Sequence, residues 1–215
     1  MRGALNAGIG MVGLNSGRVS FLDTNESSGV TDTFTAADST DLNGRASDSG
    51  HIWTTHEGAF SISSNRATTD ATGTRKRATV ESEIANIYLT CTALSNSGDA
   101  AFVIRHTGAD DYWLIEIKQA ADTVKIWEHI AAGWAERASV SVTIDEDIEY
   151  IFTIIASDET ITVYTAGANK ISYASAAANK TVTTHGFYQF SGSSGGKYWD
   201  DLSITEYTGD EALPI

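Results

Sequence analysis

The chain is built from short segments in which apolar and polar residues alternate. These segments are rich in Ile, Val, Thr and aromatic residues, and their lengths are typical of β-strands. They span residues 59–63, 79–84, 86–94, 101–106, 112–118, 123–130, 138–144, 150–156, 160–165, 170–173, 185–190 and 198–207. Gly, Asn, Asp and Ser separate them at spacings of ~8–12 residues, which is the pattern of a β-sandwich or barrel. The sequence therefore predicts an all-β fold, either a sandwich or a barrel.

The first part of the chain has a different texture. Residues 1–30 are dominated by Gly, Ala, Ser and Asn, and only residues 18–22 resemble a strand. Glycine-rich segments do not fold alone, so such an arm either orders by packing on a larger assembly or stays a loose terminus. We expect an extended N-terminal arm at 1–30, a sandwich at 31–208 and a C-terminal tail at 209–215.

Two consecutive segments allow faces to be assigned, because side chains in a strand alternate between the two sides of the sheet. Trp113, Ile115 and Ile117 share one face of the first segment, and Val124 and Ile126 share one face of the second. We expect these five in the core. The opposite face would then present Tyr112, Glu116, Lys118, Lys125, Trp127 and His129, with Trp134 just beyond.

This outward face is an aromatic platform ringed by polar groups. Trp127 and Trp134 are its most exposed candidates, whereas Trp53 and Trp113 are expected in the core. Exposed indoles in a β-sandwich stack sugar rings, but large aromatics are also favoured at subunit interfaces. Both interpretations, a glycan site and a partner contact, stay open at this point.

Charge and cysteine content narrow the classes of partner. The formal net charge of −14 over 215 residues disfavours nucleic acid, because phosphate binding needs a basic face. No stretch approaches the ~18–20 apolar residues of a membrane helix, and residues 1–17 lack a signal-peptide pattern, so no membrane partner is expected. The single cysteine, Cys91, lies in an alternating run and is predicted to be a small core residue.

Several strings occur in an order that resembles a known family. They are Asp32-Thr33-Phe34, Asp48 to Trp53, Gly58 to Ile62, Phe102 to Arg105 with Asp111 to Trp113, Glu149 to Ile154, Ile161 to Tyr164, Thr184 to Gly186 and Tyr198 to Ile204. Together they resemble concanavalin A-like lectin/glucanase (laminin-G-like) domains of the kind found in tailed-bacteriophage virion proteins. The resemblance covers roughly residues 31 to 207 and implies a concanavalin-like jelly-roll sandwich of two antiparallel sheets.

The resemblance also implies a function. It favours a non-enzymatic structural protein of the phage virion, either a capsid decoration protein or a tail-associated one. The arm would bind other virion proteins, and the sandwich would stabilise the shell or adhere to cell-surface glycans, in a homo-oligomer. The alternatives are a free carbohydrate-binding module or lectin, and a glycoside hydrolase of the concanavalin-like class.

Candidate catalytic and metal-binding groups are weighed against simpler interpretations. Asp145, Asp147 and Glu149 alternate as the carboxylates of related glucanases do, but they match the turn leading into the strand at Tyr150, so no catalytic residue is expected. Asp110-Asp111 and Asp200-Asp201 supply only part of the ~6–8 oxygen ligands that calcium takes. We expect no cofactor and no metal, with calcium as the alternative.

Overall fold

The computed structural model describes residues 29–69, 73–95, 99–165, 169–191 and 196–213. Within them the regular structure is β-strand apart from one 3-10 turn, η1 (Gln119–Ala121). The all-β prediction is confirmed. Most of the predicted arm, and the strand expected at 18–22, lie outside the described residues.

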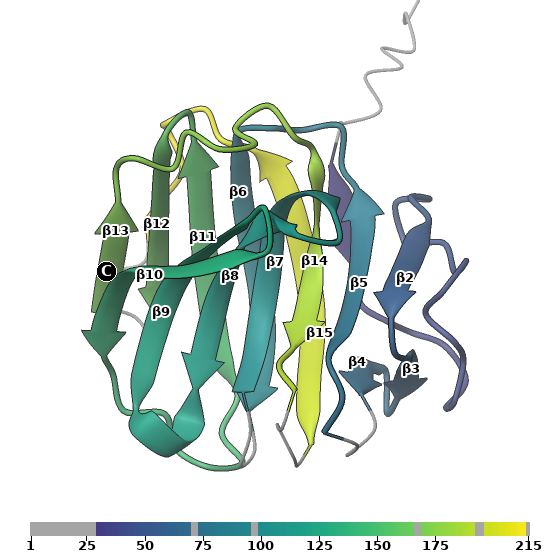
Figure 1. The fold of residues 1–215 in the computed structure, drawn as a ribbon. Coiled ribbons are helices and arrows are strands. Elements are labelled where there is room, and N and C mark those ends of the chain that lie inside the picture. Colours follow the sequence, from purple (N-terminus) through teal and green to yellow (C-terminus); the bar gives the residue numbers. More distant parts are fainter. Residues whose placement is uncertain (1–28, 70–72, 96–98, 166–168, 192–195, 214–215) are drawn as a thin grey trace, which may run out of the picture.

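The strands form two antiparallel sheets that face each other (Figure 1). The first sheet has the order β13-β12-β11-β6-β15-β4-β3, and β1 also pairs with β15. Its strands are β1 (Val30–Asp32), β3 (Phe60–Ser63), β4 (Arg66–Thr69), β6 (Ile87–Ser95), β11 (Tyr150–Ser157), β12 (Thr160–Thr165), β13 (Asn169–Tyr173) and β15 (Lys197–Glu206).

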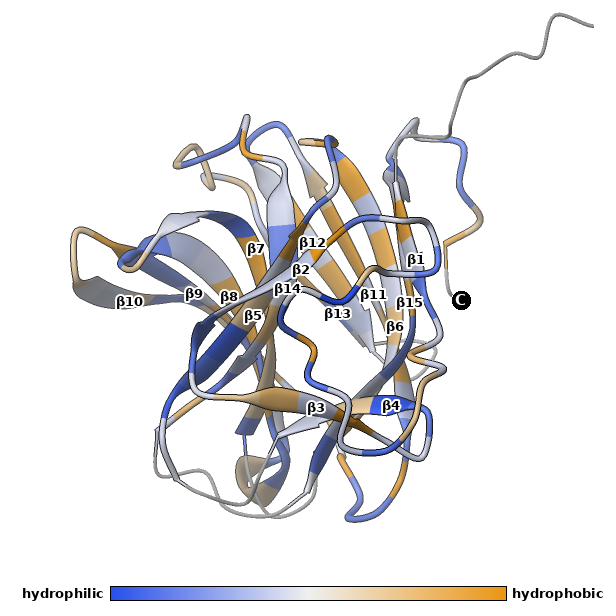
Figure 2. Cartoon of the chain, turned by 90° about the vertical axis from the view of Figure 1, so that its right-hand side faces the viewer, coloured by the Kyte–Doolittle hydropathy of each residue, from blue (hydrophilic) through white to orange (hydrophobic). Residues whose placement is uncertain are grey.

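The second sheet has the order β10-β9-β8-β7-β14-β5-β2. Its strands are β2 (Trp53–Glu57), β5 (Lys76–Glu81), β7 (Asp99–Gly108), β8 (Asp111–Lys118), β9 (Thr123–Ile130), β10 (Gly133–Ser141) and β14 (Thr184–Gln189). In the side view of Figure 2, β10, β9 and β8 lie in one layer, and β6, β15 and β1 in the other.

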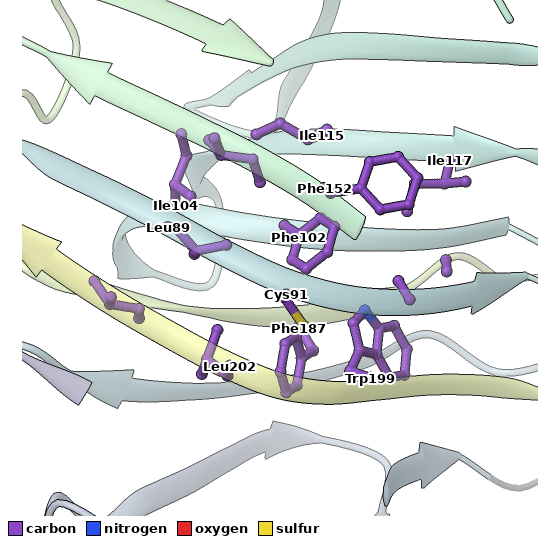
Figure 3. Close-up of a cluster of buried hydrophobic side chains, with 14 of the residues drawn as sticks. Leu89, Cys91, Phe102, Ile104, Ile115, Ile117, Phe152, Phe187, Trp199 and Leu202 are labelled. Atoms are coloured by element: carbon purple, nitrogen blue, oxygen red, sulfur yellow. The ribbon is translucent and has the colours of Figure 1, made fainter. Parts of the chain in front are cut away.

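The main core fills the space between the two sheets. Both sheets contribute large side chains to it, including the fully buried Trp53, Trp113 and Trp199. Figure 3 shows part of this core, with Phe102 and Phe187 of the second sheet and Phe152 of the first among the labelled residues. Phe187 stacks on Trp199 across the core, with ring centroids 5.0 Å apart. The core positions predicted from residues 112–130 are all buried here, as is Cys91.

The hairpin of β9 and β10 departs from a simple layer. The two strands are joined by Ala131 and Ala132 alone, and both residues have positive φ, 49° and 63°. In Figure 1 the tip of this hairpin passes in front of β8 and β7 toward β14. Contacts agree, because Trp134 of β10 reaches Tyr188 of β14, with ring centroids 6.5 Å apart, although three strands separate β10 from β14 in the sheet. The hairpin therefore covers part of the outer face of its own sheet.

Candidate functional site

The outer face of the second sheet carries a hydrophobic cluster of its own. Its buried members are Ala101, Val103, Tyr112, Leu114 and Tyr188, and Trp127 and Phe190 pack against them. A sheet face turned away from the core is normally polar, so an apolar layer here indicates a surface made to be covered.

Register brings the residues predicted for this face together. Across β8 and β9, Tyr112 pairs with His129, Leu114 with Trp127, and Glu116 with Lys125. Directly paired residues on one face have neighbouring side chains. The pattern of the sequence had placed the same residues on one side, and the structure shows them as cross-strand neighbours.

Trp134 sits on this layer as its outermost member. The side chain is at the tip of the hairpin, and the residue is 42% exposed. Its ring lies 4.1 Å from that of His129, 5.9 Å from Phe190 and 6.2 Å from Trp127, between ring centroids. Trp134 and Trp127 meet nearly at right angles, at 81°, and so form two walls of a corner.

A pocket of about 430 Å³ opens beside this corner. This volume is in the range of small-ligand sites, which are lined by aromatic side chains and a few polar groups. Four of its lining residues were predicted from the sequence: Glu116, Lys118, Trp127 and Trp134. The others are Arg75, Asp99, Tyr188, Phe190 and Ser191.

Glu116 is the buried acid of the pocket. Its Oε2 accepts a hydrogen bond of 2.7 Å from Trp127 Nε1, which fixes both side chains. Burial raises the pKa of the Glu116 carboxyl above its ordinary value, as does the nearby Asp99, while the Trp127 hydrogen bond and Lys118 oppose the rise. The second oxygen, Oε1, lies 4.0 Å from Lys118 Nζ. The carboxylate is thus held in place with acceptor capacity left for a ligand hydroxyl.

The cations around the pocket are paired with carboxylates. Lys118 Nζ lies 3.7 Å from Asp99 Oδ2, in addition to its contact with Glu116. Arg75 forms an ion pair of 2.5 Å with Glu57, and this pairing raises the pKa of its guanidinium. These pairs give the rim polar groups of both signs around an aromatic centre.

The remaining predicted residues have different positions from those expected. Tyr112 and His129 belong to the same face but are covered, because the hairpin tip lies over them. They support the pocket instead of lining it. Lys125 also lies outside its lining; it forms an ion pair of 2.6 Å with Glu136 and sits 5.4 Å above the Trp127 ring.

The lining residues that lie outside β8, β9 and β10 were not predicted from the sequence. Tyr188 and Phe190 alternate with the core residue Phe187, so a period-two analysis of residues 185–190 could have found them. Arg75 and Asp99 lie at strand ends, and no local signal in the sequence indicates that they approach this face.

Two more histidines, His56 of β2 and His106 of β7, lie near Tyr112 on the same sheet. His106 lies 4.5 Å from His56 and 5.8 Å from Tyr112, between ring centroids. The buried Arg77 places its guanidinium 4.9 Å above the Tyr112 ring. Burial, Arg77 and His56 lower the pKa of His106 to about 3, so this ring is neutral at physiological pH.

The acidic series at 145–149 is not part of a strand. It precedes β11, as predicted, and its members have separate local roles. Asp145 accepts a hydrogen bond of 3.1 Å from the Tyr150 hydroxyl, and Glu149 forms an ion pair of 2.5 Å with Arg66. The facing carboxylates that a glucanase strand would supply are therefore not provided by this segment.

The acidic pairs considered for calcium have contacts within the protein. Among the described residues, no group of three or more His, Cys, Asp and Glu side chains could hold a metal ion. Of the two acidic pairs considered for calcium, Asp111 accepts a hydrogen bond of 2.9 Å from the backbone of Ala131, and Asp200 lies 3.8 Å from Arg66.

In the described part of the chain, no helix is long and apolar enough to cross a membrane.

A second hollow, of about 370 Å³, lies on the outer face of the first sheet. Tyr164, Lys170 and Tyr207 are among its lining residues, and Lys170 sits 5.6 Å above the Tyr164 ring. Its lining contains no tryptophan. The aromatic pocket on the second sheet is therefore the stronger candidate.

Comparison with known proteins places the fold but no sequence family. No protein-family model and no curated sequence matches the chain. Solved structures do match. A carbohydrate-binding module from Bacillus subtilis (CBM66) has a TM-score of 0.53 at 14% identity, over 77% of this chain and 94% of that one.

Two further neighbours agree. A galectin-like protein of unknown function from Bacillus subtilis has a TM-score of 0.55 at 13% identity, over 79% of this chain and 97% of that one. The exoplasmic/lumenal domain of VIP36, solved with Ca²⁺ and a dimannoside, has a TM-score of 0.53 at 11% identity, over 81% of this chain and 89% of that one.

A glycoside hydrolase is also among the neighbours. The GH43 protein BlXynB from Bacillus licheniformis has a TM-score of 0.59 at 11% identity, over 86% of this chain but 40% of that one.

These likenesses define the class of fold. The chain is a galectin-like or concanavalin-like jelly-roll sandwich, as the sequence predicted. Neighbours with this fold include a carbohydrate-binding module and a domain solved with a bound dimannoside. Nothing in the comparisons ties the chain to phage virion proteins, so the virion role stays a prediction.

Proposed function

We propose that this protein is a non-enzymatic carbohydrate-binding domain, and that it binds glycan in the pocket beside Trp127 and Trp134. The observation that carries the proposal is the exposed Trp134 indole, set at 81° to Trp127 in a pocket that also contains a buried carboxylate. The lectin interpretation thereby moves ahead of the virion interpretation as the main one.

The chemistry of the pocket suits a sugar. One face of a pyranose ring is formed by C–H groups and packs against an indole, and its edge carries hydroxyls that need fixed partners. Trp134 offers the platform, and Glu116 offers an acceptor that Trp127 holds in position. A buried, oriented acceptor gives specificity, because a ligand lacking the matching hydroxyl leaves it unpaired.

The fold comparison supports the proposal in a general way. The carbohydrate-binding module and the mannoside-bound domain share the jelly roll, but at 14% and 11% identity they indicate the fold and not the ligand. The location of the site in this protein rests on its own pocket.

The test is a glycan array followed by calorimetry on the best binder. We expect Trp134→Ala to weaken binding by at least about tenfold, since truncation of an aromatic hot spot costs about 2 kcal/mol or more. The matched control is Tyr207→Ala, which removes an aromatic side chain from the hollow on the first sheet. If Tyr207→Ala abolishes binding and Trp134→Ala leaves it intact, the site lies on the other face.

Attachment to a virion is a separate proposal that this site does not require. It depends on the arm, of which residues 1–28 lie outside the described part of the chain. A virion location and a homo-oligomer therefore stay predictions. Attachment through the arm is tested by whether a chain lacking residues 1–28 still enters phage particles.

A further inference from the structure

The exposed indole of the pocket rests on a buried histidine. Trp134 and His129 are paired across β10 and β9, and their rings lie 4.1 Å apart at 35°. His129 also contacts Tyr112, its partner on β8, with ring centroids 4.8 Å apart. Tyr112 and Trp134 meet as well, at 6.2 Å between ring centroids, so the three rings form one cluster across three strands, in which His129 is only 2% exposed.

We infer that His129 is a positioning residue for Trp134, and that protonation of His129 in acid releases the hairpin tip and with it the Trp134 wall of the pocket. The consequence for sugar binding rests on the proposed function, but the release of the hairpin does not. The geometry of this three-ring cluster carries the inference, and three further observations bear on it.

The first observation is the absence of a partner for a second proton. Among the described residues, Nδ1 of His129 is buried without a hydrogen-bond partner. A neutral imidazole can leave one nitrogen as a bare acceptor, whereas an imidazolium must place N–H donors on both. A buried donor without a partner, on a charged ring, is far more costly.

The second observation is the set of charged and titratable groups around the three-ring cluster. The charged groups that act on His129 are two arginines at β5, Arg75 and Arg77, and two acids at the start of β8, Asp110 and Asp111. Further titratable groups nearby are Tyr112, His56, Glu57, His106 and Tyr188. The two acids favour a charged His129, and the two arginines oppose it. Burial is the largest effect, and the pKa of His129 is lowered.

The third observation concerns the hairpin, whose tip is held on the sheet by the ring contacts of Trp134 and by the hydrogen bond from the Ala131 backbone to Asp111. Most residues of β10 are exposed, and the connecting Ala131 and Ala132 adopt the left-handed backbone. A hairpin tip lifted from the sheet gives His129 access to water and a pKa near the ordinary value of about 6.5. The open form therefore binds the proton more readily than the closed form.

The direction of the pH effect follows from this difference. A histidine whose pKa is lowered in the closed form stabilises that form above about pH 6.5, and the stabilisation is lost as the pH falls below it. One such group shifts the equilibrium by at most about tenfold per pH unit.

A cation–π contact is the opposing effect. An imidazolium above the indole of Trp134 gains electrostatic attraction, which would hold the hairpin more firmly in acid. The enclosure of His129 and its two neighbouring arginines favour release. The two effects predict opposite signs, so experiment distinguishes them.

The experiment is hydrogen exchange of the full chain without ligand, at pH 7.0 and pH 5.5, corrected for the intrinsic exchange rate. In the unmodified protein we expect peptides covering Thr123–Ser141 to lose protection at pH 5.5 relative to β7 and β14. In His129→Phe, which keeps a flat ring under Trp134 but has no titrating nitrogen, this selective loss should be absent.

A second variant separates support from titration. His129→Ala should reduce hairpin protection at both pH values, because the platform under Trp134 is lost. Equal protection of the hairpin in the unmodified protein at both pH values, or greater protection at pH 5.5, would overturn the inference. The same loss at pH 5.5 in His129→Phe would also overturn it.

Binding provides an independent readout. With the best binder from the array, the fall in affinity between pH 7.0 and 5.5 should be smaller in His129→Phe than in the unmodified protein. Protonation of Glu116 also weakens binding in acid, and the Glu116→Gln variant removes that contribution. If no glycan binds at all, the proposed function fails while the exchange result still decides the role of His129.

Discussion

The buried Asp32 carboxylate connects groups from three other positions in the chain. Its buried carboxylate accepts hydrogen bonds from Arg45 at 2.5 and 3.0 Å, from the Trp53 indole at 2.7 Å and from the backbone of Phe34 at 2.8 Å. The strings that suggested the family resemblance, around Asp32, Phe34 and Trp53, therefore meet in space. Asp32, Arg45 and Trp53 form a polar clamp that holds β1 against the core.

We predict that Asp32→Asn strongly destabilises the protein. The substitution keeps the shape but replaces one acceptor oxygen with a donor, and it leaves Arg45 with the more distant and more exposed Asp48 in place of its buried charge partner. Loss of one member of a buried ion pair costs about 3–5 kcal/mol. Urea unfolding measures the change.

Asp48→Asn is the control at the same clamp. Asp48 accepts a hydrogen bond of 2.8 Å from Thr33 and lies 3.9 Å from Arg45, but its side chain is 40% exposed. We expect a cost of about 1 kcal/mol or less. Similar costs for both variants would mean that the clamp does not depend on the buried charge.

At the scale of elements, the β9–β10 hairpin is the feature that makes the pocket. Its two-residue turn has positive φ at both positions, the geometry for which Asn-Gly is favoured, yet the sequence has Ala-Ala. Alanine pays a penalty in this region because its Cβ approaches the backbone. Packing of Trp134 on the aromatic layer offsets this strain.

We predict that the double variant Ala131→Asn, Ala132→Gly stabilises the protein by about 1 kcal/mol. The hydrogen bond from the backbone of residue 131 to Asp111 is retained, because it does not depend on the side chain. Thermal unfolding should show a higher midpoint.

The matched control is Ala120→Asn, Ala121→Gly in η1. Those two alanines are also adjacent and exposed, but neither has positive φ. Their replacement should leave the midpoint unchanged or lower it. An equal increase in both variants would show that turn strain is not the cause.

At the scale of the whole molecule, histidines buried as neutral groups make the fold sensitive to acid. His185 lies between the sheets, where Nδ1 accepts a hydrogen bond of 3.3 Å from the backbone of Arg105 and Nε2 lies 3.0 Å from the carbonyl oxygen of Ile84. Burial, more than any other effect, lowers its pKa to about 4. The unfolded chain binds this proton from about pH 6.5 downward, so the free energy of unfolding falls as the pH falls below that value.

We predict that His185→Gln flattens the dependence of stability on pH. A glutamine amide can accept from Arg105 and donate to Ile84 without titrating. Between pH 7 and pH 5 the unmodified protein should lose roughly 2 kcal/mol through His185 alone, and the variant should lose less by about that amount.

Urea unfolding at the two pH values measures this difference. The control is His51→Gln, which alters a partly exposed histidine and should leave the pH 7 to pH 5 difference unchanged. An unchanged difference in His185→Gln would mean that His185 is not the source of acid sensitivity.

The all-β class, the face of the sheet on which each residue of β8 and β9 lies, and the burial of Trp53 and Trp113 were all predictable from the sequence. These features follow from the period of two, which is local and which the core enforces, since a slip of one residue would exchange the two faces. The shared face of Glu116 and Trp127 could be predicted for the same reason.

What covers that face depends on contacts between distant parts of the chain. The hairpin folds back over its own sheet, so Tyr112 and His129 are buried and Trp134 becomes the wall of a pocket. Alternation says which side a residue faces but not whether water or another element lies there. Arg75 and Phe190 complete the pocket from distant parts of the chain. Their approach depends on the order of strands in the sheet, which long-range packing fixes and no local pattern encodes.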